Sequence, residues 1–132
     1  MLKKLTTKRG GFTLVEIMIV VAIIALLAAI AVPGFLRARK RSQASKVLND
    51  LRLISSAMDQ YAIETTKKSG DQIAVVDWTN YLKKDTVLYT TGADLFGRPY
   101  GQQEVDSLPR VDATTKAALS DVTDEAFWSP YN

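Results

Sequence analysis

A long uncharged segment near the N-terminus limits what this chain can fold into. From Phe12 to Leu36 there are 25 residues, and Glu16 is the only charged one. At about 1.5 Å per residue, a helix of this length reaches roughly 37 Å, which exceeds the about 30 Å of hydrocarbon in a bilayer. A core helix of a small soluble domain is not apolar on every face for so long. The segment therefore predicts a transmembrane helix.

A secretory signal peptide is the alternative interpretation of such a segment. Its apolar region would be about 7–15 residues long and would precede a cleavage site made of small residues. Here the apolar run is longer, and the small residues Gly10 and Gly11 lie before it. The pattern favours a membrane anchor.

Glu16 is unusual because it places a carboxylate inside the apolar segment. Near the centre of a bilayer such a residue costs about 2.5–3.5 kcal/mol on insertion scales. One interpretation is that Glu16 lies close enough to the interface to reach water. The other is that it pairs with a cation from another subunit. The physics alone does not separate the two.

A basic leader, a Gly-Gly pair, the sequence FTLVE and a long apolar helix interrupted by Pro33 resemble the class III signal of type IV pilins and type II secretion pseudopilins. The resemblance covers about residues 8–35 without gaps. It implies that a prepilin peptidase cuts after Gly11 and that Phe12, the new N-terminal residue, is N-methylated. It further implies that Glu16 pairs with the N-terminal amine of a neighbouring subunit during filament assembly.

Charge is distributed unevenly along the chain, whose formal net charge is +3. The leader, residues 1–11, contains no acid and four basic residues, Lys3, Lys4, Lys8 and Arg9. Removing these four of the 17 basic residues leaves 13 against 14 acidic ones, so the whole-chain charge is no argument for a nucleic-acid partner. The leader favours a cytoplasmic N-terminus, but a second basic run follows the apolar segment and balances it. The orientation therefore rests on the resemblance.

Two absent residue types narrow the possible chemistry, because the 132 residues include no histidine and no cysteine. The commonest general base and most zinc sites are thereby excluded. No disulfide can close a C-terminal loop, as one does in many type IV pilins. No Gly-rich phosphate loop and no pair of catalytic carboxylates can be identified. We therefore expect a protein that is not an enzyme and has no catalytic residue.

The helical pattern continues beyond Pro33 and Gly34, where a kink is expected. Apolar residues recur at three- and four-residue spacing from Val47 to Ala62, with polar residues between them. We expect one helix over about residues 12–64, whose second half buries one stripe. The resemblance implies an α+β fold in which this helix packs on a small antiparallel sheet. The expected domains are a leader (1–11), a transmembrane or filament-core helix (12–36) and a globular domain (37–132).

Several short elements are expected after the long helix. In chain order they are a helix stop at Gly70, a helical turn over 78–83 capped by Asp77, strands over 87–91, 100–105 and 107–111, and a helix over 113–119 capped by Asp112. Large aromatic residues near a terminus usually dock on the domain. We expect this of Phe127, Trp128 and Tyr131.

The sequence DLFGRPYG, residues 94–101, resembles the Asp-Pro-Trp-Gly-x-Pro-Tyr segment of the major pseudopilins of type II secretion. Leu95 and Phe96 stand where that pattern has proline and tryptophan. Taken without the resemblance, the segment predicts a turn between strands with Gly97 at positive φ. The resemblance favours a major pseudopilin over the pilin of a surface pilus.

Two charged clusters have functional interpretations that we weigh against plainer ones. Oxygen ligands for calcium could come from Asp121, Asp124 and Glu125, but an ordinary solvated acidic turn is favoured. The basic run Arg37, Arg39, Lys40 and Arg41 could bind phosphate groups, but contact with lipid headgroups or with acids of neighbouring subunits is favoured. We expect no cofactor, no metal and no nucleic acid.

The expected function is structural. The resemblance implies a subunit of a type II secretion pseudopilus that crosses the inner membrane once, with its N-terminus cytoplasmic before processing and its globular domain periplasmic, and then polymerises into a helical filament. The implied partners are copies of itself, the prepilin peptidase, a polytopic platform protein and an assembly ATPase. Two alternatives stay open: a type IV pilin of a surface pilus for adhesion, motility or DNA uptake, and an anchored domain that never polymerises.

Overall fold

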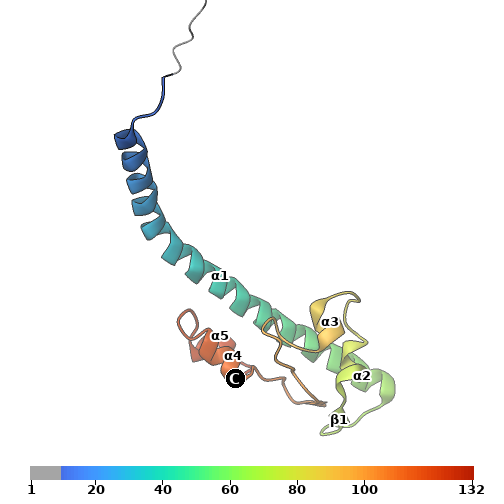
Figure 1. Cartoon of the computed structure of the whole chain (residues 1–132). Helices are drawn as coiled ribbons and strands as arrows, with labels where there is room; N and C mark the ends of the chain where they lie inside the picture. The colour runs from blue at the N-terminus through green and yellow to red at the C-terminus, as the bar shows by residue number, and fades with distance from the viewer. Residues whose placement is uncertain (1–9) are drawn as a thin grey trace, which may run out of the picture. The chain divides into compact units, whose positions relative to one another are not determined.

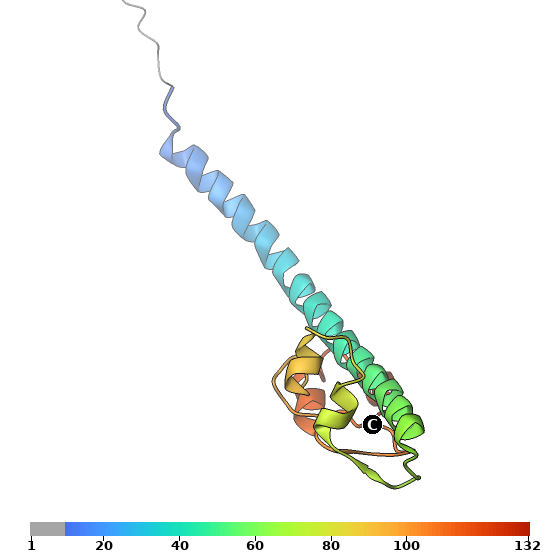
Figure 2. The same cartoon turned by 90° about the vertical axis from the view of Figure 1, so that its right-hand side faces the viewer.

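The computed structural model describes residues 10–132, which contain one long helix, four short helices and two short strands (Figures 1 and 2). In chain order the elements are α1 (Leu14–Thr65), β1 (Gln72–Ile73), α2 (Val75–Thr79), α3 (Val87–Thr91), β2 (Gln103–Glu104), α4 (Ala113–Ala118) and α5 (Glu125–Trp128). The expected α+β fold, with one long N-terminal helix and a small antiparallel sheet, is confirmed.

The chain divides into two compact units, Met1–Leu36 and Arg37–Asn132, and α1 has residues in both. Most of the expected leader lies outside the described residues. In the described part of the first unit, α1 exposes its apolar side chains on all sides. By length and composition, α1 is the one helix among residues 10–132 that can cross a membrane. Pro33 lies inside α1, and the kink expected there stays a prediction.

The core of the second unit forms along one buried stripe of α1. Its members are Ala44, Val47, Leu51, Ile54, Ala57 and Met58. Toward the start of the stripe, the buried side chains of Trp128 and Tyr131 complete one cluster. Toward its end, Trp78 and Leu88 complete a second. The predicted stripe and the docking of the C-terminal aromatics are therefore confirmed, with Phe127 half-buried.

The sheet is smaller than predicted. It pairs β1 with β2 antiparallel, Gln72 opposite Glu104 and Ile73 opposite Gln103. The strand expected over 107–111 is wrong: Asp106 adopts φ 63, and Ser107 donates back to the Glu104 carbonyl at 3.1 Å, which turns the chain away. The chain beyond this turn is irregular, and the Val111 N–H bonds instead to the Tyr131 carbonyl at 3.0 Å.

The strand expected over 87–91 is also wrong, because these residues form α3. The Thr86 hydroxyl accepts the Tyr89 N–H at 3.2 Å, which caps the helix. Gly92 ends it in the left-handed region at φ 59, and a Cβ there would lie 2.7 Å from Val75 Cγ1. The two end signals outweigh the β propensity of the residues between them.

One further boundary differs from the prediction, and two are confirmed. The turn expected over 78–83 is α2, which begins earlier; Asp77 lies within its first turn and accepts the Ala74 N–H at 3.3 Å instead of preceding the helix. α1 ends at Thr65, one residue beyond the expected end, where Thr66 takes φ 53; the stop signal named at Gly70 lies further along the chain. Asp112 caps α4 as predicted, accepting from the Thr114 N–H at 2.9 Å.

Candidate functional site

The bond between Gly11 and Phe12 lies in an exposed, irregular segment just before α1. Phe12 is 84% exposed. Neither Gly10 nor Gly11 has another atom within 4 Å of where a Cβ would stand. A bond in such a segment is open to an enzyme without local unfolding.

Glu16 belongs to a capping box at the start of α1. The Thr13 backbone N–H donates to Glu16 Oε2 at 2.8 Å, and the Glu16 N–H donates to Thr13 Oγ1 at 3.2 Å. Two unpaired donors of the first helical turn are thereby satisfied, and the carboxylate lies at the positive end of the helix dipole. The capping box was not predicted, although Thr-x-x-Glu before an apolar run is its sequence signal.

The capping box adds a third interpretation of Glu16 to the two left open by the sequence. The carboxylate has a partner within its own chain, so neither interfacial water nor a foreign cation is needed to hold it. An ionised carboxylate has about four lone-pair positions. Glu16 can therefore accept a cation from a neighbour while still capping α1.

The DLFGRPYG segment joins its turn to α4 through Asp94. This carboxyl, 3% exposed, accepts the backbone N–H groups of Phe96 at 2.8 Å and Arg98 at 2.9 Å, and the Thr115 hydroxyl at 2.5 Å. The Arg98 guanidinium donates to Thr115 Oγ1 at 2.8 Å. Gly97 has φ 78, as predicted. These hydrogen bonds hold the turn of the DLFGRPYG segment against α4, and we call them the Asp94 staple.

The three acidic residues weighed as calcium ligands each have a different partner. Asp121 pairs with Lys40 at 2.8 Å, and this bond lowers the pKa of the Asp121 carboxyl. Glu125 pairs with Lys116 at 2.8 Å, and Asp124 caps α5. Within residues 10–132, no three His, Cys, Asp or Glu side chains gather as metal ligands would. The ion pair with Asp121 also engages Lys40, which is one member of the basic run weighed as a phosphate-binding cluster.

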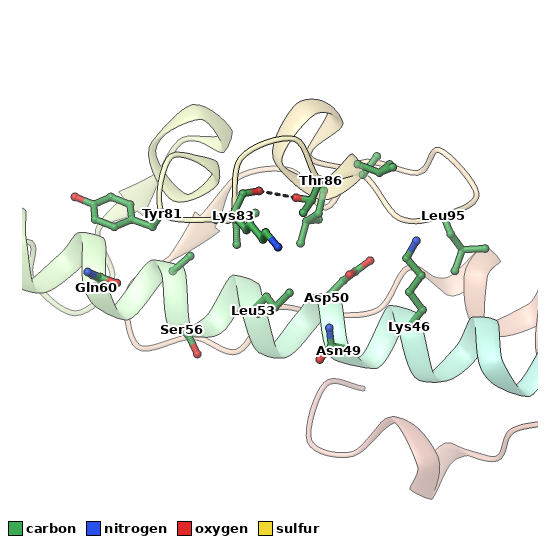
Figure 3. A pocket seen from close by; sticks show the side chains of 15 residues that line it. Lys46, Asn49, Asp50, Leu53, Ser56, Gln60, Tyr81, Lys83, Thr86 and Leu95 are labelled. Carbon is green, nitrogen blue, oxygen red and sulfur yellow. Dashed lines mark hydrogen bonds between the residues drawn. The ribbon is translucent and has the colours of Figure 1, made fainter.

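A groove of about 370 Å³ runs along α1 in the second unit, opposite the chain between α2 and the end of α3 (Figure 3). Leu53, 46% exposed, and Val87, 55% exposed, give it apolar walls. Lys46 and Asp50 extend into it from α1, and Lys83 extends into it from the chain that faces α1. The groove was not predicted, because α1 supplies only one of its walls.

Asp50 is a largely buried acid on the groove wall. The residue is 7% exposed, and its carboxyl points into the groove. Burial raises the pKa of Asp50; Lys46 opposes this and Asp94 adds to it. Nearby, the buried Tyr100 hydroxyl has no partner in the described part of the chain, and burial raises the pKa of Tyr100 as well.

Asp50→Asn is expected to stabilise the second unit at neutral pH. A carboxyl whose pKa is raised by folding contributes most below its unfolded pKa, and that contribution is lost as the pH rises through the folded value. Removing the charge should raise Tm by about 2–5 °C at pH 7 and change it little below about pH 3.5. Thermal unfolding followed by the fluorescence of the buried Trp78 and Trp128 measures this. An equal shift at both pH values would contradict it.

One family model matches the N-terminal segment. Residues 6–32 match the prokaryotic N-terminal methylation motif, and Gly11, Phe12 and Glu16 lie within the match. No solved structure matches the chain significantly.

Curated relatives are found among proteins of two named systems. The chain is 37% identical over 94 residues to the type IV major fimbrial protein FimA of Dichelobacter nodosus, covering 70% of this chain and 56% of FimA. It is 42% identical over 62 residues to the type IV major pilin protein PilA of Myxococcus xanthus, covering 47% and 28%. It is 36% identical over 59 residues to the type II secretion system core protein G of Escherichia coli, covering 45% and 41%. The chain thus spans between 28% and 56% of the length of these relatives.

Proposed function

Because the chain carries the prokaryotic N-terminal methylation motif and is related to type IV pilins and to core protein G of type II secretion, we propose that it is a structural filament subunit. The observation that carries the proposal is the combination of a cleavable Gly11–Phe12 bond with a charged residue, Glu16, at the head of an exposed apolar helix. A simple membrane anchor needs neither feature.

Processing comes first in the proposed sequence of events. A prepilin peptidase removes residues 1–11, and Phe12 becomes the N-methylated N-terminus. The apolar part of α1 holds the subunit in the inner membrane, with the second unit on the periplasmic side. An assembly ATPase and a platform protein then draw subunits into a fibre. The subunit catalyses nothing itself and needs no cofactor.

Glu16 has the central role in assembly under this proposal. Its carboxylate accepts the N-terminal amine of the neighbouring subunit, a cation with an ordinary pKa near about 7.7–8.0. The capping box supports this role, because it holds the carboxylate at the helix start with acceptor positions to spare. Pro33 and Gly34 supply a weak point in α1 where the packed helices can deform.

We assign the fibre to a type II secretion pseudopilus, and the DLFGRPYG staple around Asp94 supports this choice. A surface pilus is the second candidate, and it too has an observation in its favour. The similarity to FimA extends over 94 residues, against 59 for core protein G. Deleting the gene and assaying both extracellular enzyme release and surface pili separates the two. Loss of pili with normal secretion would overturn the pseudopilus assignment.

Gly11→Val is expected to block processing and leave the precursor in the membrane. The peptidase must accommodate the residue before the cut, and a β-branched side chain does not fit where glycine does. The intact mass of the membrane-extracted protein measures cleavage directly. Gly10→Val is the matched control, since neither glycine has a neighbouring atom within 4 Å and neither change disturbs the fold. A mature N-terminus at any residue other than Phe12 would refute the processing step.

A further inference from the structure

Two separate surface features lie along the second half of α1. One is the groove that contains Lys46, Asp50 and Leu53. The other, here named the Ile63 patch, is a shallow hollow to which α1 and the loops after α1 and β2 contribute Asp59, Ile63, Lys67 and Asp106. Asp50 and Asp59 are nine residues apart, which is two and a half helical turns at 3.6 residues per turn, so they point to opposite sides of α1. Leu53 and Ile63, ten residues apart, lie about 80° apart around the helix.

Three features of the groove indicate what kind of protein surface could bind in it. The Asp50 carboxyl points into the groove from a residue that is only 7% exposed. Neither Lys46 nor Lys83 forms an ion pair with any residue from 10 to 132. Leu53 and Val87 leave apolar surface exposed beside these charges. A fitting occupant therefore brings one donor or cation, two acids and an apolar side chain.

The Ile63 patch offers the matching set. Ile63 is 78% exposed, the highest exposure of any large apolar residue in the second unit. Asp59 and Asp106 flank it with two carboxylates, and Lys67 adds one ammonium. As in the groove, none of these charged groups is ion-paired within the described chain. The charges and the apolar residue of the patch thus mirror those of the groove.

We propose that the groove receives the Ile63 patch of a second copy of this chain. Ile63 packs between Leu53 and Val87 of the receiving copy, the two carboxylates approach Lys46 and Lys83, and Lys67 approaches Asp50. Desolvated, complementary contacts of this kind define register between subunits more than they add affinity.

The contact is heterologous, because each copy uses one surface to receive and a different one to dock. Contacts of this type either close into rings or continue as open helical arrays. Because groove and patch share no residue, every docked copy presents a free groove or a free patch to the next. This inference rests on the proposed function, and it names the surface by which the second units register along the fibre.

Disulfide trapping tests the contact, and the chain is suited to it because it has no cysteine. Leu53→Cys/Ile63→Cys is expressed with the assembly machinery, the cells are oxidised, and the products are separated without reductant. The two positions are about 15 Å apart along α1, too far for the roughly 7 Å limit of a disulfide within one chain. We expect a ladder that extends beyond trimers. Co-expressing the two single variants should give dimers only.

The matched control is Leu53→Cys/Val76→Cys. Val76 is 62% exposed and borders neither the groove nor the patch, so no ladder is expected. Dimers from Leu53→Cys alone would mean that the groove faces itself, and a cross-link to a different protein would mean another occupant; either result overturns the proposal. If the Leu53→Cys/Ile63→Cys variant forms filaments like those of the wild type but its chains stay unlinked after oxidation, the proposal is overturned too. If wild-type chains form no filaments, the proposed function fails first, and this inference with it.

Charge reversal gives an independent test. Lys46→Glu/Lys83→Glu is expected to lower the yield of sheared filaments, relative to membrane content, at least about fivefold. Asp59→Lys/Asp106→Lys should do the same, and combining all four changes should restore most of the yield. Lys84→Glu, an exposed lysine outside the groove, is the control. If the variant with all four changes keeps its unfolding temperature but does not recover filament yield, the result counts against the contact.

Discussion

Glu16→Leu chains are expected to insert and to be cleaved like the wild type, yet to enter filaments at least about tenfold less well. Leucine removes the insertion penalty of a carboxylate, so the membrane step improves if it changes at all. Under the proposed assembly, it also leaves the amine of a neighbouring subunit without a counter-charge among packed apolar helices. An uncompensated charge in such surroundings is strongly destabilising.

Two companion variants separate the charge of Glu16 from its capping role. Glu16→Gln keeps an oxygen that can accept the Thr13 N–H, so it preserves the capping box but loses the charge. Thr13→Val keeps the charge but loses the hydroxyl that accepts the Glu16 N–H. If the charge drives assembly, Glu16→Gln fails like Glu16→Leu, and Thr13→Val retains much of its yield.

The measurement is sheared-filament yield beside membrane content in cells with the full machinery. Wild-type-like polymerisation of Glu16→Leu would refute the assembly role and favour a carboxylate that only caps α1 near the interface. Loss of filaments with Thr13→Val alone would point to the helix start itself as the requirement.

Asp94→Ala is expected to destabilise the second unit by about 2–4 kcal/mol, and to lower its Tm by roughly 10–20 °C. The change leaves two backbone N–H groups, those of Phe96 and Arg98, without their acceptor. It also removes the carboxylate that accepts the Thr115 hydroxyl proton, in a residue that is fully buried. Unsatisfied buried donors carry the full cost of their desolvation.

Asp94→Asn is the matched comparison for this prediction. Its amide oxygen can still accept from both backbone N–H groups, while its NH₂ meets the Thr115 hydroxyl, so the loss should be smaller than for alanine. Thermal unfolding followed through Trp78 and Trp128, both in the second unit, gives the values. An alanine variant that melts within about 2 °C of the wild type would show that the staple contributes little.

The long helix could be predicted because two independent patterns agree on it. The first part is apolar throughout, and the second carries one buried stripe, which places the helix within two residues of its observed bounds, Leu14 and Thr65. The Asp112 cap and the positive φ of Gly97 were predictable for a similar reason. In each case the signal lies within a few residues of its effect.

The predictions of the short helices and strands were wrong where the conformation of about one helical turn had to be assigned from residue propensity alone. Residues Val87–Thr91 favour a strand by composition, but the Thr86 hydroxyl and the left-handed Gly92 at its two ends impose a helical turn. Both end signals are present in the sequence, but the prediction relied on the β propensity of the residues between them. The two-residue strands β1 and β2 are too short to leave a periodic pattern at all.

The candidate sites divide in the same way. Gly11, Phe12 and Glu16 could be proposed as site residues from the sequence because they lie within one short motif. The Asp94 staple joins residues 21 positions apart, and the groove joins α1 to a loop some 30 residues further along. Pairings of that kind follow from packing, which a single sequence does not reveal. The Thr13–Glu16 box, by contrast, has a local sequence signal and was still missed.

The shortness of the sheet affects how readily this domain could aggregate by strand addition when many copies are held close together. Unpaired strand edges invite other chains to add strands, which is a common route to amyloid-like deposits. Within residues 10–132 the sheet amounts to two residues on each of two strands, so it offers almost no template for such growth. A fibre holds its domains at very high local concentration for long periods. In the proposed fibre, this domain therefore offers its neighbours little free backbone for strand addition.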